Sequence, residues 1–101
     1  MEKIKIFKRL YDTDRNIFGK EVRKTYAYYI AVRRFGFLWF PVTFYFYHYR
    51  ENKDKVAGLL KTDEVTFCYA SRKHATLFDT EADAIRIKLD IVQHPDKYIK
   101  A

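Results

Sequence analysis

The chain of 101 residues is long enough for one folded domain, because domains typically contain about 100–150 residues. Its composition, 49% hydrophobic and 33% charged with a formal net charge of +7, is globular and excludes a disordered tail or a collagen-like chain. The one cysteine, Cys68, excludes an internal disulfide scaffold. We therefore expect a single domain over residues 1–101.

Four segments of the chain are predicted to be strands. Residues 3–11 and 22–34 alternate between two faces, and the second segment carries apolar or aromatic side chains on both, as a central strand does. Residues 12–16 have the short polar side chains of a turn. The strongest strand signal, rich in β-branched and aromatic residues, covers 42–49, and a further strand covers 64–70.

The C-terminal segment 80–93 fits two kinds of structure. Thr80 and Asp83 have the spacing of a helix capping box, in which a hydroxyl and a carboxylate bond free amides, and Pro95 provides a stop. Apolar residues, however, occupy every second position from Ile85 to Ile91, as in a strand. We favour the helix because of its cap and its stop. The predicted fold is α+β, an antiparallel sheet of four or more strands with one C-terminal helix packed on a face.

The sequence predicts no targeting or membrane segment. Residues 1–6 alternate charged and apolar side chains, which is not the pattern of a signal peptide. The longest uncharged run, 35–49, is fifteen residues long and contains Pro41, whereas a spanning helix needs about 20 apolar residues. We expect no membrane partner and no secretion through a signal peptide.

The calcium-loop pattern near the N-terminus is incomplete. Asp12, Asp14 and Asn16 match the opening of such a loop. Ile17 and Arg23 occupy the positions of its turn glycine and its bidentate glutamate. The segment is therefore interpreted as a hairpin loop rather than a metal site.

Other catalytic and metal-binding patterns are also incomplete. No two of the soft-metal ligands His48, His74, His94 and Cys68 stand within about five residues of each other, the spacing that presents two ligands to zinc. The sequence contains no glycine-rich phosphate loop and no nucleophile elbow. We predict no catalytic residue, no metal and no cofactor, and a protein that is not an enzyme.

Charge and aromatic residues are concentrated in the first half of the chain. Residues 1–50 contain eleven basic and four acidic side chains, whereas the basic and acidic side chains of residues 51–101 balance. Twelve of the nineteen aromatic residues lie between Tyr26 and Tyr49. This asymmetry predicts one contact surface, because Tyr and Arg are enriched among interface anchors. The predicted partner-interface residues are Arg33, Arg34, Trp39, Tyr45, Tyr47 and Tyr49.

The segment Arg33–Phe40 carries a local resemblance to a known family. Its order of basic, glycine and aromatic residues resembles the aromatic RNA-binding strand of RNA-recognition motifs, with Arg34 at the first glycine position. The segment Tyr45–Tyr49 is similar to a nucleic-acid-binding strand of cold-shock domains. This resemblance implies a single-stranded nucleic-acid binder as the alternative function, with rings that stack on bases. Its contact residues would be Phe35, Phe37, Phe46 and His48; packing of Phe35, Phe37 and Trp39 in the core stays open beside it.

A second resemblance concerns the whole layout. The segments Phe78–Ala82 and His94–Ile99, which open and follow the predicted helix, look like those of small phage-encoded accessory and virion proteins. The resemblance implies a non-enzymatic interaction module, a structural or accessory subunit of a phage-like assembly. Its partners would be other protein subunits, either copies of itself or a capsid-like protein. Its location would be the host cytoplasm or the virion.

Overall fold

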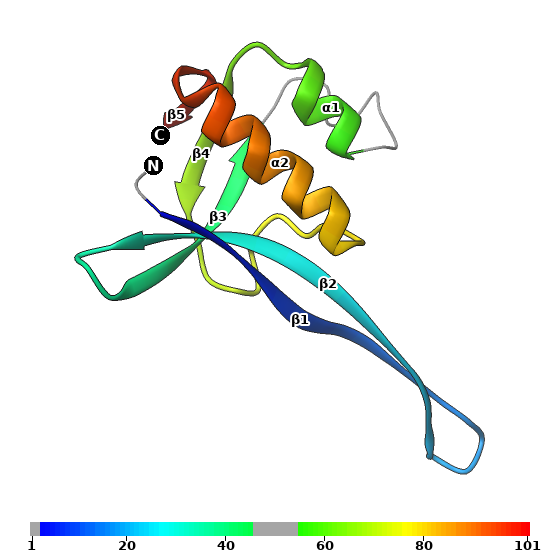
Figure 1. Cartoon of the computed structure of the whole chain (residues 1–101). Coiled ribbons are helices and arrows are strands. Elements are labelled where there is room, and N and C mark those ends of the chain that lie inside the picture. The colour runs from blue at the N-terminus through cyan, green and yellow to red at the C-terminus, as the bar shows by residue number, and fades with distance from the viewer. Residues whose placement is uncertain (1–2, 46–54) are drawn as a thin grey trace.

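A five-stranded sheet and two helices form an α+β fold (Figure 1). The computed structural model describes residues 3–45 and 55–101, without the side chains of 11–14 and 21–23. The sheet has the strand order β1-β2-β3-β4-β5 and is antiparallel except for the parallel pair β4 and β5. The elements are β1 (Ile4–Arg15), β2 (Glu21–Arg34), β3 (Leu38–Tyr45), α1 (Lys55–Lys61), β4 (Val65–Tyr69), α2 (Glu81–Gln93), the 3₁₀ turn η1 (Pro95–Lys97) and β5 (Tyr98–Lys100). The predicted α+β class and C-terminal helix are confirmed.

Strand β2 is the central strand of the N-terminal part of the sheet. Its neighbours Ile30 and Ala31 point to opposite faces, and their exposed fractions are 0% and 1%. Both faces are therefore covered at this point, as the apolar pattern of residues 22–34 predicts. Ile30 pairs with Ile6 of β1, whereas Ala31 pairs with Pro41 of β3.

Strand β3 leaves β2 after its first half, and the segment before α2 fills the gap. Residues 38–41 pair with β2, and residues 42–45 pair with β4. The amide of Thr76 donates to the carbonyl of Val42, and Phe78 exchanges two backbone hydrogen bonds with Tyr28. Phe78 is only 2% exposed. Residues 76–78 thus join the two halves of the sheet and lead the chain into α2.

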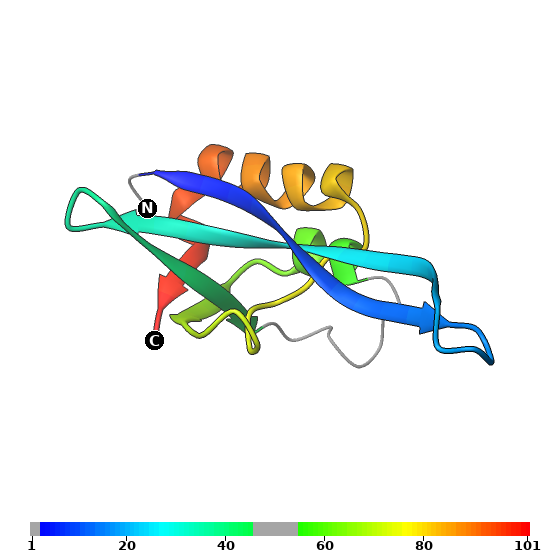
Figure 2. The ribbon, with the colours of Figure 1, turned by 90° about the horizontal axis from the view of Figure 1, so that it is seen from below.

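Both helices lie on one face of the sheet. Figure 2 shows the same ribbon from below the view of Figure 1. Helix α2 contributes Ala84, Ile87 and Ile91, its inner face, and α1 contributes Val56 and Leu59. These side chains pack on a core of strand residues that includes Ile30, Val32, Val42, Phe44, Val65 and Phe67. A smaller cluster covers the other face of the sheet: Tyr29, Ala31 and Ala75, with Phe7, Trp39 and Leu77 packed against them.

Helix α2 also explains the alternating pattern from Ile85 to Ile91. The Thr80 hydroxyl accepts a hydrogen bond from the Asp83 amide at 3.1 Å, so the predicted cap is present. In a helix, positions two apart lie about 200° apart around the axis. An apolar residue at every second position therefore puts apolar side chains on two opposed faces. The strand-like pattern belongs to a helix that is apolar inside and outside.

The predicted turn at residues 12–16 is wrong, because β1 continues to Arg15. The hairpin turn follows at residues 16–19, where Gly19 has a φ of 77°. A backbone position with a left-handed conformation favours glycine, so Gly19 marks the turn. The short polar side chains of residues 12–16 did not by themselves locate it. Helix α1 and strand β5 were not predicted. Of the predicted strand 42–49, the part up to Tyr45 belongs to β3; residues 46–49 lie outside the described residues.

Candidate interaction surface

The β2–β3 turn displays aromatic side chains on a left-handed backbone. Phe35 has a φ of 56° and Gly36 a φ of 81°. The exposed fractions of Phe35 and Phe37 are 71% and 73%, and that of Leu38 is 44%. We call residues 35–38 the aromatic turn. Figure 1 shows it at the end of the β2–β3 hairpin, away from both helices.

The ring of Phe35 contacts two neighbouring side chains. Its centroid lies 6.3 Å from that of Phe40 in an edge-to-face arrangement, and the guanidinium of Arg34 lies 5.2 Å from it. Such contacts orient an exposed ring without burying it. The ring is therefore presented to solvent in a defined position.

Cations from three strands surround the base of this hairpin. Lys5 of β1 and Arg33 of β2 lie 5.8 and 5.9 Å from the Trp39 ring. Arg34 and Lys100 of β5 each lie 5.0 Å from the ring of a second aromatic residue, Tyr69 of β4. A ring attracts a cation but carries no net charge, so the positive charge is oriented and not neutralised. We call Lys5, Arg33, Arg34 and Lys100 the cationic base of the turn.

Trp39 is a predicted anchor that packs against other aromatic side chains. It is half-buried on the face of the sheet opposite the helices. Its ring meets Phe7 edge-on at 5.8 Å, and Phe7 stacks on Tyr29 at 5.5 Å. Trp39 therefore packs under the β2–β3 hairpin, on the face of the sheet opposite the helices, and part of its ring stays accessible.

Tyr45 is exposed but lies at the other end of β3 from the aromatic turn. Its exposed fraction is 57%, and its hydroxyl accepts a hydrogen bond from the Cys68 thiol at 3.6 Å. The interaction with Cys68 holds the pKa of Tyr45 above its ordinary value of 10.0. The structure thus brings together five of the sequence-predicted site residues and leaves Tyr45 apart. Those five are Arg33, Arg34, Phe35, Phe37 and Trp39; Phe46, Tyr47, His48 and Tyr49 lie outside the described residues.

A second exposed apolar turn was missed by the sequence analysis. Ile17 and Phe18, at the tip of the β1–β2 hairpin, are 93% and 80% exposed. The Asn16 side chain accepts hydrogen bonds from the amides of Phe18 and Lys20, both at 3.0 Å. Asn16 and Gly19 thus fix the turn and leave the two apolar side chains outside it. The signal in the sequence was the pair Asn16 and Gly19, not the acidic residues before them.

The part of the chain that the structure describes contains neither a cluster of metal-ligating side chains nor a membrane-spanning helix. Within residues 3–45 and 55–101, no three His, Cys, Asp or Glu side chains gather closely enough to hold a metal ion. In the same ranges, no helix has the length and apolar character needed to cross a membrane. The Ser71 hydroxyl lies 2.8 Å from Nδ1 of His74, which follows three positions later in an exposed turn.

Comparison with known proteins adds no relative. No protein-family model, curated protein or solved structure matches this chain.

Proposed function

We propose that the protein is a non-enzymatic interaction module, a structural or accessory subunit of a larger protein assembly, and that its aromatic turn contacts a partner subunit. One observation carries the proposal: Phe35 has a left-handed backbone and is nevertheless 71% exposed. A left-handed conformation costs an ordinary L-residue about 1–2 kcal/mol, and Gly, Asn or Asp avoid most of that cost. An exposed ring recovers little of it by packing. Burial of the ring against a partner would offset the cost of the left-handed backbone.

The surroundings of the turn indicate the chemistry of that partner. Phe35, Phe37 and Leu38 offer an apolar ridge, and Arg33 and Arg34 stand at its base. A complementary surface has an apolar pocket with carboxylates or carbonyl groups at its rim. We propose a virion or a related assembly as the setting, because the segments Phe78–Ala82 and His94–Ile99 resemble those of small phage-encoded proteins.

Site-specific photocrosslinking in the producing cell tests the proposal. A photoreactive phenylalanine analogue at position 37 keeps an aromatic ring at the turn and is expected to give one discrete crosslinked protein. The same analogue at Arg72, which is exposed and whose carbonyl accepts a hydrogen bond from Arg9 of β1, serves as the control. Equal crosslinking from both positions, or none from position 37, contradicts the proposal.

A second candidate is single-stranded nucleic-acid binding, which the cationic base of the turn favours. Rings stack on bases while cations neutralise phosphates, and each phosphate contact makes the affinity fall as salt rises. Titration of labelled oligothymidylate at several salt concentrations separates the two candidates. A steep salt dependence that Arg34→Ala reduces supports nucleic-acid binding, and absence of binding at low salt rejects it.

A further inference from the structure

Helix α2 has an apolar stripe on the face that points away from the sheet. Its three large members, Ile85, Leu89 and Val92, are 41%, 51% and 62% exposed. Ala82, also exposed, extends the stripe by one turn toward the N-terminus of the helix. We call these four residues the outer stripe. On a helical wheel the stripe lies nearly opposite the inner face, whose residues are at most 2% exposed.

The spacing of the outer stripe is that of a helix-pairing seam. Its members follow one another at intervals of three, four and three residues, which is the repeat that keeps a seam against a second helix. A helix that is apolar on opposed faces is typical of a buried helix, with cover on both sides. The sheet covers the inner face, and the outer stripe has the form of a face built to be covered as well.

The polar residues on either side of the outer stripe indicate which partner can pair with it. Glu81 and Lys88 flank it on one side, and Arg86 and Gln93 flank it on the other. When two copies of α2 pair in parallel and in register, Glu81 of each copy stands beside Arg86 of the other. When they pair antiparallel with the stripes centred on each other, Arg86 meets Arg86 and Lys88 meets Lys88. The charges therefore complement a parallel second copy and repel an antiparallel one.

We infer that the outer stripe of α2 is a self-association face, on which a second copy of this chain pairs in parallel and in register. Arg86 lies 4.0 Å from Asp83 of its own helix and is 57% exposed, so its guanidinium is accessible to Glu81 of the second copy. Three partly exposed side chains are less than the roughly 800 Å² per partner of a standard interface. The dimer is therefore weak and reversible. It uses a different face from the aromatic turn and does not rest on the proposed function.

Cysteine crosslinking tests the pairing and its direction. In a Cys68→Ser background, Ile85→Cys and Leu89→Cys are oxidised separately and as an equal mixture, with exposed Lys73→Cys as the control. A parallel dimer places each new cysteine opposite itself, so each variant crosslinks alone and faster than the control. An antiparallel dimer places position 85 opposite position 89, so crosslinks then appear only in the mixture. That result, or crosslinking no faster than the control, overturns the inference.

Charge exchange gives an independent readout in the unoxidised protein. Arg86→Glu puts two like charges beside each other at both Glu81 contacts and is expected to weaken dimerisation roughly fivefold in sedimentation equilibrium. Glu81→Arg acts in the same way. Mixing the two variants restores both attractive contacts and the original affinity. A wild-type chain that stays monomeric at millimolar concentration overturns the inference, whereas Phe35→Asn is expected to dimerise like the wild type.

Discussion

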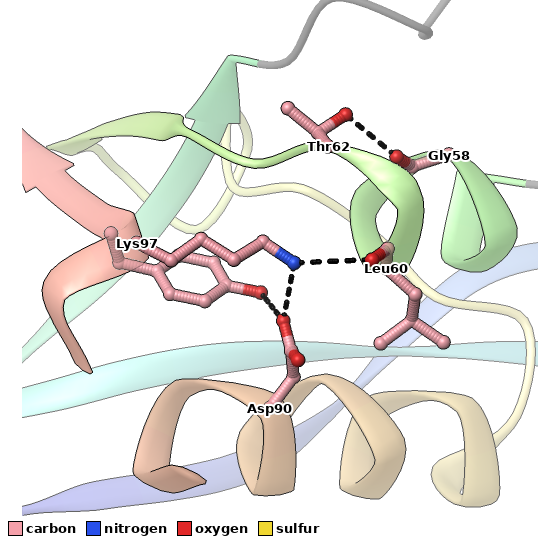
Figure 3. A network of polar contacts seen from close by, with 6 residues as sticks. Gly58, Leu60, Thr62, Asp90 and Lys97 are labelled. Carbon is pink, nitrogen blue, oxygen red and sulfur yellow. Dashed lines mark hydrogen bonds and ion pairs between the residues drawn. The ribbon is translucent and has the colours of Figure 1, made fainter. Parts of the chain in front are cut away.

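The Nζ atom of Lys97 lies 2.7 Å from Oδ2 of Asp90, and both side chains are only about one tenth exposed (Figure 3). The same carboxylate oxygen accepts a hydrogen bond from the Tyr98 hydroxyl at 2.6 Å. Lys97 also donates to the carbonyl of Leu60 in α1 at 3.4 Å. One carboxylate of α2 thereby holds the start of β5 and, through Lys97, the end of α1. This network fixes the helix that carries the outer stripe.

Asp90→Ala is expected to lower the free energy of unfolding by about 3 kcal/mol, because it leaves the Lys97 charge buried without its partner. Urea denaturation measures this change. The double variant Asp90→Leu/Lys97→Met removes both charges and is expected to recover most of the loss. A double variant as unstable as Asp90→Ala contradicts this role of the ion pair.

Stability is expected to fall as pH rises above about 10. Burial, together with the hydrogen bond to Asp90, raises the pKa of Tyr98 above its ordinary value of 10.0. The unfolded chain then loses this proton before the folded chain does, so alkaline pH favours unfolding. Thermal unfolding between pH 8 and 11 measures the effect. Tyr98→Phe has no proton to lose at this position, so its melting temperature should decline less; equal declines contradict the assignment.

Asn16→Ala is expected to loosen the tip of the β1–β2 hairpin without unfolding the domain. It removes the acceptor for the amides of Phe18 and Lys20. Among the described residues, the strands near the tip pair only with each other, so their opening is not expected to disturb the core. Hydrogen exchange should become faster in residues 13–24 and stay unchanged in α2. Faster exchange across the whole sheet contradicts this view of an independent arm.

Much of the fold followed from local sequence patterns. The strand at residues 22–34 carries apolar side chains at both odd and even positions, and the structure covers both of its faces. The Thr80 cap and Pro95 outweighed the alternation from Ile85 to Ile91, and the helix is present. In each case a short-range signal predicts the element directly: an apolar pattern for the strand and a helix cap for the helix.

The two elements that were not predicted, α1 and β5, depend on contacts with distant parts of the chain. Helix α1 has only seven residues and is stabilised by Val56 and Leu59 in a core formed by other elements. Strand β5 exists because three residues pair with β4, some thirty positions earlier. For the candidate site, composition indicated the aromatic and basic half. It did not indicate that Phe35 and Phe37 form a turn while Trp39 packs against Phe7.

The thermal stability of Phe35→Asn tests most directly whether this phenylalanine serves contact rather than folding. Asparagine adopts the left-handed backbone at lower cost, and the substitution removes an exposed ring whose contacts with Phe40 and Arg34 do not bury it. The melting temperature is therefore expected to stay the same or rise by a few degrees, while crosslinking from position 37 is lost. A fall of more than about 5 °C, roughly 1 kcal/mol for a domain of this size, would show that Phe35 is kept for packing. That result contradicts the central claim.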